Sequence, residues 1–220
     1  MKKSPEEKIS EIIPVKEFSD NEYLVMVTKN GIIKKTPASE YESIRKSGKI
    51  AITLKEGDEL ISIFKTTGND NIFLATRNGM AICFNENDAR AVGRTASGVK
   101  AIDLADGDYV VGAEPVREDS KVLLVTDGGY GKCTDLTSFR IQHRGGKGLK
   151  AYKITEKTGN IIGISMVNDS EELIMVTSEG VVIRIRIKDI ATTTGRITQG
   201  VRLINLDDGV TVVSMDKISA

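Results

Sequence analysis

The sequence predicts an all-β protein in which four-stranded blades repeat radially, as in a propeller. Three observations carry this prediction: short apolar strands alternate with glycine turns, the pattern returns about every 50 residues, and no segment of useful length has helical periodicity. The turn glycines Gly31, Gly79, Gly129 and Gly180 lie 48, 50 and 51 residues apart. Four strands in each repeat of this length indicate a radial all-β fold.

The first residues have two interpretations. Residues 4–7 (Ser-Pro-Glu-Glu) are typical of a helix start. However, residues 7–15 (EKISEIIPV) align with residues 108–116 (DYVVGAEPV), and both segments end in Pro-Val. We favour the second interpretation, in which residues 7–15 are the last strand of a missing preceding blade. The chain would then begin within a repeat, and Met1 would not be a native domain boundary.

The remaining residues form four repeats, which we assign to a single domain over residues 1–220. The repeats span approximately residues 22–66, 71–116, 121–167 and 172–216. Each opens with a hairpin, at residues 23–31, 72–80, 122–130 and 173–181, and Asn-Gly in the first two turns favours a tight turn. A polar stretch ending in glycine follows, and then the apolar segments 50–54, 99–104, 149–154 and 201–206. The final strands are expected at 59–64, 109–113, 160–166 and 210–215.

The composition is that of a soluble globular protein, with 28% charged and 40% hydrophobic residues among 220. It excludes a disordered chain, collagen and a coiled coil. No apolar run approaches the ~20 residues that span a bilayer, and two cysteines give no disulfide framework, so we expect a cytoplasmic protein. A single histidine and two lone cysteines also argue against a zinc site, and we predict no metal site.

Basic residues gather in the same half of every repeat, although 31 basic and 31 acidic residues cancel over the whole chain. Residues 29–49, 77–100, 132–153 and 184–202 carry net charges of +4, +2, +5 and +4. Charged hairpin tips are common, but they would have mixed signs. In a radial fold these segments should join into a basic rim that suits the backbone of duplex DNA. Only 5% of residues are aromatic, which argues against stacking on single strands and against base readout, and favours backbone contact with a bent duplex.

The most specific motif is the heptad Gln-His-Arg-Gly-Gly-Lys-Gly at residues 142–148. Its adjacent glycines would let the backbone approach a phosphate, with Arg144 and Lys147 as flanking donors, although a glycine-rich turn with incidental basic residues is the simpler alternative. The candidate DNA-binding residues of the heptad are Gln142, Arg144, Gly145, Gly146, Lys147 and Gly148. The candidates elsewhere in the repeats are Lys34, Lys35, Arg45, Lys46, Lys49, Arg94, Lys100, Lys132, Arg140, Lys150, Arg184, Arg186, Arg196 and Arg202.

The heptad resembles the Q-x-R-G-G-K-G box in the C-terminal domain of the DNA gyrase A protein, a type IIA DNA topoisomerase. The similarity extends from about residue 9 to 215 and includes residues 56–60 (EGDEL), 129–132 (GYGK) and 195–201 (GRITQGV). The resemblance implies a β-pinwheel whose neighbouring blades exchange strands and whose basic rim wraps double-stranded DNA, directing ATP-dependent negative supercoiling by the whole enzyme. It also implies assembly with the remainder of the gyrase A protein and with the gyrase B protein in an A₂B₂ heterotetramer. This enzyme would be located in the bacterial cytoplasm and associated with the chromosome. ATP and Mg are expected only in the rest of the enzyme.

The chain departs from the family pattern at several positions. The principal box of the family lies in its first blade, whereas this heptad is in the third visible repeat, and a full domain has about six blades. We therefore expect the principal box in the missing part. Arginine is usual in the family at the positions of Cys83 and Cys133, so two rim charges are expected to be lost. His143 occupies the variable position of the box and is interpreted as a polar filler.

No catalytic chemistry is predicted for this chain. None of its five tyrosines resembles the DNA-cleaving context, no Gly-Lys-Ser/Thr loop for ATP is present, and Asp106 and Asp108 are interpreted as turn formers. We predict a non-catalytic module that binds and wraps DNA. The alternatives are the C-terminal domain of the topoisomerase IV A protein, which binds DNA without full wrapping, and a propeller-type scaffold for protein interactions.

Overall fold

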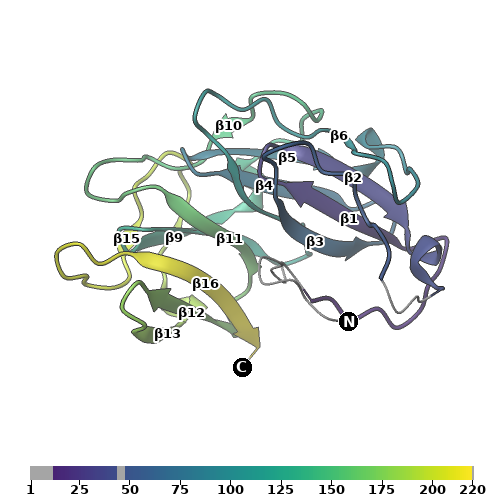
Figure 1. Cartoon of the computed structure of the whole chain (residues 1–220). Coiled ribbons are helices and arrows are strands. Elements are labelled where there is room, and N and C mark those ends of the chain that lie inside the picture. Colours follow the sequence, from purple (N-terminus) through teal and green to yellow (C-terminus); the bar gives the residue numbers. More distant parts are fainter. Residues whose placement is uncertain (1–11, 44–47, 220) are drawn as a thin grey trace.

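The computed structural model describes residues 12–43 and 48–219, and it confirms the predicted all-β fold class. Four small sheets follow one another around an arc, as the blades of a propeller-like β-pinwheel do (Figure 1). In the described ranges the helical structure consists of short 3₁₀ turns at Ala38–Tyr41, Glu86–Asp88, Leu136–Ser138 and Ile187–Asp189. No helix among these residues has the length and apolar character needed to cross a membrane.

Each blade has the last strand of its repeat at the centre of the arc and the hairpin outside it. The first blade has the order β3 (Leu60–Thr66), β1 (Tyr23–Thr28), β2 (Ile32–Pro37) and β6 (Val99–Lys100). The second has β7 (Val110–Pro115), β4 (Asn71–Thr76), β5 (Met80–Asn85) and β10 (Leu149–Lys150). The third has β11 (Ile161–Val167), β8 (Lys121–Thr126) and β9 (Tyr130–Asp135), with β14 (Thr192–Thr193) and β15 (Val201–Arg202) both paired to β9. The fourth has β16 (Val212–Ser219), β12 (Glu171–Thr177) and β13 (Val182–Arg186).

Neighbouring blades exchange strands, as the family resemblance implied. The short strands β6, β10 and β15 come from one repeat and pair with the outer strand of the preceding blade, so that Ile32 faces Lys100, Met80 faces Lys150 and Tyr130 faces Arg202. A glycine precedes each donated strand. A Cβ atom at Gly98, Gly148 or Gly200 would lie 2.4 Å from a carbonyl oxygen of the outer strand, so this close approach requires glycine.

The hydrophobic core lies between adjacent blades. Val25, Val27 and Ile33 of the first blade pack with Ile72 and Leu74 of the second in one cluster of buried side chains. A second cluster joins the second and third blades, and a third cluster joins the third and fourth. Because the next blade covers each outer strand, β2, β5 and β9 are buried on both faces.

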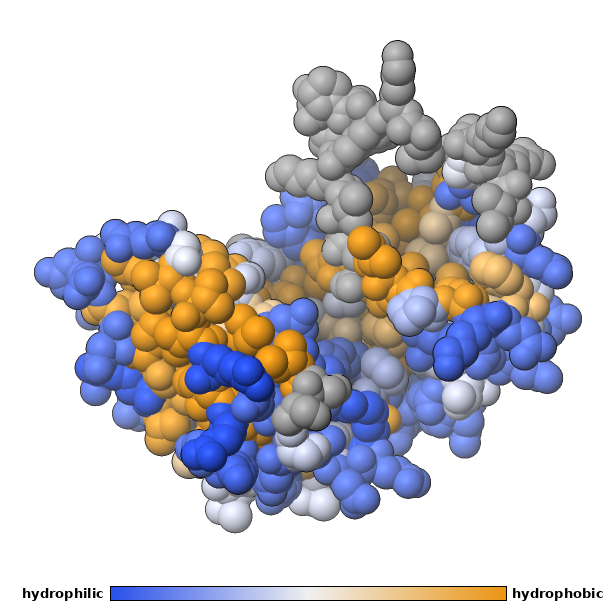
Figure 2. Space-filling model, turned by 90° about the horizontal axis from the view of Figure 1, so that it is seen from below, coloured by the Kyte–Doolittle hydropathy of each residue, from blue (hydrophilic) through white to orange (hydrophobic). Residues whose placement is uncertain are grey.

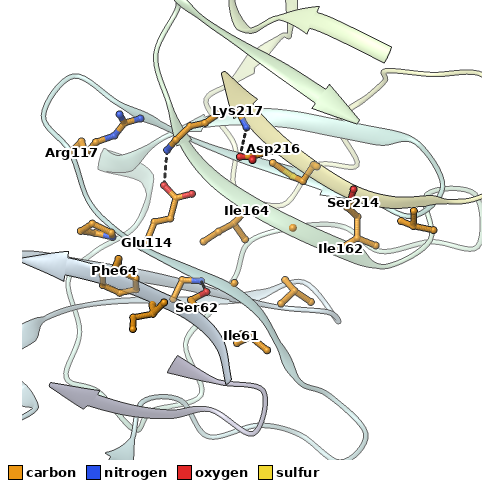
Figure 3. Close-up of a pocket in the computed structure, with 18 residues that line it drawn as sticks. Ile61, Ser62, Phe64, Glu114, Arg117, Ile162, Ile164, Ser214, Asp216 and Lys217 are labelled. Carbon is orange, nitrogen blue, oxygen red and sulfur yellow. Dashed lines mark hydrogen bonds and ion pairs between the residues drawn. The ribbon is translucent and has the colours of Figure 1, made fainter. Parts of the chain in front are cut away.

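The inner strands β3, β7, β11 and β16 surround a central cavity of about 570 Å³ (Figure 3). Ile61, Ile162 and Val213 line it, and Lys217 forms an ion pair with Glu114 at 2.8 Å beside it. The basic loops described below lie away from this cavity, at the outer strands.

The strand predicted for residues 7–15 lies largely outside the described residues. Residues 12–15 are described and form no strand.

Candidate nucleic-acid interface

The basic segments of the repeats stack on one another through their arginines. The guanidinium Nη1 of Arg94 donates to the carbonyl oxygen of Ile50 at 3.0 Å. Arg144 makes the equivalent bond to Lys100 at 2.9 Å, and Arg196 makes it to Lys150 at 2.9 Å. Each loop is therefore attached to the donated segment of the preceding repeat.

Backbone hydrogen bonds repeat along the same stack. The carbonyl oxygens of Ala96, Gly146 and Thr198 accept from the N–H groups of Thr53, Asp103 and Lys153 at 3.3, 2.9 and 3.0 Å. We call the stacked segments 48–54, 89–104, 139–154 and 190–206 the basic band. The band contains eleven basic residues and one acidic residue, Asp103, so it concentrates positive charge in a chain of zero net charge.

The predicted DNA-binding residues within the band differ in exposure. Arg140, Lys147 and Lys150 are exposed and form no ion pair within the described part of the chain. Lys100 and Arg202 are exposed but have local partners, Asp103 for Lys100 and both Tyr130 and Asn205 for Arg202. The hydrogen bond from Lys100 lowers the pKa of Asp103. Lys49, Arg94, Arg144 and Arg196 are partly buried. Arg90 and Lys153 are also exposed in the band and were missed, although their loop positions could have identified them.

The heptad is held partly by internal contacts. The Arg144 Nε donates to the carbonyl oxygen of Asp88 at 2.8 Å, and the Asp88 carboxylate accepts from the Arg144 backbone N–H at 3.2 Å and contacts His143 at 3.3 Å. The Gly145 N–H donates to Ala101, and the Gln142 N–H donates to Cys83. The first function of Arg144 is therefore to brace the loop, and the exposed Lys147 is the freer cation.

Gly146 is the one glycine of the heptad that the fold does not require. A Cβ atom there would meet only the carbonyl oxygen of His143, at 3.8 Å, and the backbone is not in the left-handed region. Gly148 differs, because it has a φ of 74° and the close contact with Ala81. The missing side chain at Gly146 leaves the exposed backbone open to close approach from outside.

Lys34 and Lys132 lie in the interior, contrary to their predicted place on the rim. The Lys34 ammonium donates to the carbonyl oxygens of Ala51, at 2.5 Å, and Arg94. The Lys132 ammonium donates to those of Gly195, at 3.4 Å, and Arg196. Burial, and secondarily the neighbouring Arg94 or Arg196, lowers the pKa of each lysine to about 8. These two side chains hold arginine loops from inside the stack and cannot reach a phosphate there.

Lys35 is also buried, where its ammonium lies 3.1 Å from the Glu86 carboxylate and over the Tyr23 ring. Cys83 and Cys133 occupy the same position in the next two blades, and both are buried in apolar clusters between blades. Burial raises the pKa of each thiol to about 11. A basic residue at this position would therefore face the next blade, which corrects the expectation that these cysteines remove two rim charges.

Besides the three buried lysines, four further candidate residues are not part of the band as described. Arg184 and Arg186 lie on β13, where they pair with Glu172 and Asp189. Arg45 and Lys46 fall outside the described residues.

Comparisons with known proteins agree on one kind of domain. The family model described as "DNA gyrase C-terminal domain, beta-propeller" matches residues 22–67, 70–117, 120–168 and 171–219. The chain is 49% identical over 215 residues to the DNA gyrase A protein of Clostridium acetobutylicum and 56% identical over 213 residues to that of Halalkalibacterium halodurans. These alignments cover 98% and 97% of the chain but 26% of each relative, so the chain spans about a quarter of their length.

Two solved structures are similar to the whole arc. The C-terminal domain of DNA topoisomerase IV matches with a TM-score of 0.91 and 29% identity, covering 98% of this chain and 67% of that one. A DNA gyrase A C-terminal domain matches with a TM-score of 0.82 and 26% identity, covering 92% of this chain and 68% of that one.

Proposed function

The chain belongs to the DNA gyrase C-terminal domain family, and from this premise we propose that it binds duplex DNA along the basic band and bends it around the arc. The observation that carries the proposal is the register of the stack. Arg94, Arg144 and Arg196 make the same contact in successive repeats, so the cations of each loop recur at equivalent places along one curved strip. A curved strip of cations matches the phosphate backbone of a bent duplex.

Phosphate contact falls to the exposed residues of the band. Arg140, Lys147 and Lys150 are free to neutralise phosphates, and the release of counterions supplies affinity that does not depend on sequence. Gly146 allows a phosphate to approach the backbone, while the three braced arginines hold the loops at their spacing. Lys34, Lys35 and Lys132 are left out of the proposed contact set because their ammonium groups are internal.

The rest of the proposed activity belongs to a longer protein. The relatives are gyrase A proteins of about four times this length. We propose that this module directs DNA for an enzyme that also contains the remainder of the gyrase A protein and the gyrase B protein, and that DNA cleavage and the use of ATP and Mg reside in those parts. In this proposal the chain itself is not catalytic.

Salt dependence of duplex binding tests the DNA-binding role. If roughly six to ten phosphates are neutralised, log K against log salt should have a slope of about −5 to −9. The double variant Lys147→Gln, Lys150→Gln should weaken binding to all sequences alike and reduce the slope by about 2. The matched control is Lys65→Gln, Lys121→Gln, which removes the same charge from β3 and β8, outside the segments of the band.

A flat salt response, or equal losses in the two double variants, would contradict the band as the binding surface. Absence of duplex binding would return the protein-interaction scaffold to consideration.

A further inference from the structure

The phenol of Tyr130 lies between two cations on the third blade. Tyr130 begins β9 and faces Arg202 of the donated strand β15. The Tyr130 hydroxyl oxygen accepts from the Arg202 Nε at 3.1 Å and from its Nη2 at 2.9 Å. The Lys157 ammonium lies 5.6 Å from the centroid of the Tyr130 ring, and we call these three residues the Tyr130 cluster. The hydrogen bond from Arg202 is the main cause of a lowered pKa of the phenol, and Lys157 adds to the effect.

The two positive charges of the cluster have neutral partners. Neither Arg202 nor Lys157 forms an ion pair within the described residues, and the other partner of Arg202 is the amide oxygen of Asn205, which accepts from Nη1 at 3.0 Å. Tyr130 and Asn205 therefore fix the plane of the guanidinium without cancelling its charge. These contacts occupy three of the five N–H donors of the guanidinium, so two remain for a ligand.

Lys157 is held by a turn at residues 155–159 that packs on the same blade. The Thr155 carbonyl oxygen accepts from the Thr158 N–H at 3.1 Å, and the Thr158 carbonyl oxygen accepts from the Gly128 N–H, also at 3.1 Å. A Cβ atom at Gly128 would lie 2.4 Å from the Thr158 oxygen, so the turn touches the hairpin that leads into β9. The exposed Lys157 side chain therefore starts from an anchored backbone.

The equivalent turns of the other repeats are acidic. Residues 55–58, 105–108 and 207–210 each contain two acidic residues, and Lys55 is the one basic residue among them. The turn of the third repeat has one more residue and carries one charge of each sign, at Glu156 and Lys157. This repeat therefore differs from the others in placing a cation at the turn beside its outer strand.

A second tyrosine with two cations shows what distinguishes the cluster. The Tyr109 hydroxyl is 3.2 Å from the Arg77 Nη1, and the Lys29 ammonium is 5.1 Å from the centroid of the Tyr109 ring. Here each cation has a carboxylate, with Asp127 at 3.7 Å from Arg77 and Glu59 at 3.5 Å from Lys29. The two groups are similar in arrangement, but within the described residues the charges are neutralised around Tyr109 and not in the Tyr130 cluster.

The Tyr130 cluster lies at the edge of the basic band. Arg202 belongs to the fourth segment of the band, and the turn that carries Lys157 directly follows the third. Figure 2 shows hydrophilic side chains around the margin of the lobe at the left, the side on which Figure 1 places β9 and β15. The fourth loop has Gln199 one residue before its last glycine, where the heptad has Lys147. The cluster therefore supplies positive charge next to a loop that lacks this lysine.

We propose that the Tyr130 cluster holds one phosphate group of a bound duplex between Arg202 and Lys157, with Tyr130 as the positioning residue. This inference rests on the proposed function. Arg202 offers two N–H donors in a fixed plane, Lys157 adds a flexible charge, and the phenol O–H has no acceptor among the described residues. Charge-assisted hydrogen bonds to phosphate are strong, and a guanidinium held beforehand loses less side-chain entropy on binding. The contact would extend the path of the duplex from the band to the turn at 155–159.

The salt dependence of duplex binding tests whether the two cations share one phosphate. The double variant Lys157→Gln, Arg202→Gln should weaken binding and reduce the slope of log K against log salt by about 1. The variant Lys147→Gln, Lys150→Gln removes the same charge from separate contacts and should reduce the slope by about 2.

Tyr130→Phe tests the positioning role, because it removes the phenol oxygen and no charge. Binding should weaken by about threefold to tenfold at every salt concentration, with the slope unchanged. Most of this loss should disappear in an Arg202→Gln background, since the oxygen acts through that side chain. In NMR spectra the Arg202 Nε–H signal should be sharp in the wild type and shift when duplex is added, and both properties should be lost in Tyr130→Phe.

The group around Tyr109 supplies matched controls. Tyr109→Phe and the double variant Lys29→Gln, Arg77→Gln make the same chemical changes outside the band, and their affinity and slope should stay close to those of the wild type. Asn205→Ala is a second test of positioning if Tyr130→Phe does not fold, because Asn205 is exposed and contacts Arg202 through a different nitrogen. It should also weaken binding with the slope unchanged.

Several results would overturn the inference. A slope reduced by about 2 in Lys157→Gln, Arg202→Gln would mean that the cations contact separate phosphates, and an unchanged affinity would remove both from the contact surface. Equal losses in Tyr130→Phe and Tyr109→Phe would contradict the positioning role. The proposed function would survive these results if the wild type binds duplex with a steep salt slope, whereas a flat wild-type response would contradict the proposed function itself.

Discussion

At the scale of residues, the chain uses basic side chains for two opposite purposes. Lys147 and Lys150 are exposed, whereas the ammonium groups of Lys34 and Lys132 donate hydrogen bonds to backbone carbonyl oxygens inside the stack. The sequence could not separate these groups. An outer strand is covered on both faces, so alternation along the strand carries no signal of which lysine points outward.

The buried lysines should make stability depend on pH. Burial lowers the pKa of Lys34 and Lys132 to about 8, while the unfolded chain titrates them near 10.5. Between these values the unfolded state binds more protons, so the free energy of unfolding should rise with pH, by about 1 kcal/mol per pH unit for each lysine. Below pH 8 both states are protonated and this contribution is constant.

Urea unfolding at pH 7, 8.5 and 10 measures this effect. The quantity to compare is the difference in free energy of unfolding between the wild type and the double variant Lys34→Met, Lys132→Met. The comparison cancels the titration of tyrosines and of exposed lysines. A difference that stays constant from pH 7 to 10 would mean that the carbonyl contacts keep both ammonium groups charged.

At the scale of elements, two glycines just before the donated strand β10 have different structural roles. Gly148 is required by the close packing of the strand, whereas Gly146 is not. Gly148→Ala should lower the free energy of unfolding by at least about 2 kcal/mol, because its left-handed backbone and its contact with Ala81 both resist a side chain. Gly146→Ala should change stability by less than about 1 kcal/mol yet weaken duplex binding several-fold. Chemical denaturation of the two variants measures the free energy of unfolding, and titration with duplex DNA measures their affinity.

Equal stability of the two variants would contradict the close packing at β10. Unchanged DNA affinity of Gly146→Ala would remove the backbone of the heptad from the contact surface.

The elements also show which features could be predicted from the sequence and which could not. Turn glycines and apolar runs predicted the hairpins, and their spacing predicted the radial order, because these signals lie within one repeat. The bracing of Arg144 depends on Asp88, 56 residues earlier in the preceding repeat, and no local pattern reports that contact. The burial of Cys83 and Cys133 likewise depends on the next blade.

At the scale of the whole molecule, the curvature of the band decides whether bound DNA is also wrapped. Nicked circular plasmid sealed by ligase with increasing protein should show a graded shift in linking number of one sign after deproteinisation. The shift is expected because the band follows the arc of blades, so contact along its length bends the duplex. Lys147→Gln, Lys150→Gln should require more protein for the same shift.

Salt-sensitive binding without any shift would instead indicate binding without wrapping. That behaviour is the one we expect of a topoisomerase IV domain, and the similarity in shape does not separate the two.

The placement of the core between blades has a consequence for how such molecules can change over generations. Each cluster of the hydrophobic core joins one repeat to its immediate neighbour, so the core allows a repeat to be duplicated or deleted without redesigning the others. Each such event would lengthen or shorten the band by one loop and leave its local spacing intact. Recombination between repeats would then change the length of bound DNA by the length that one loop contacts. Point substitutions would change the DNA affinity of an individual loop.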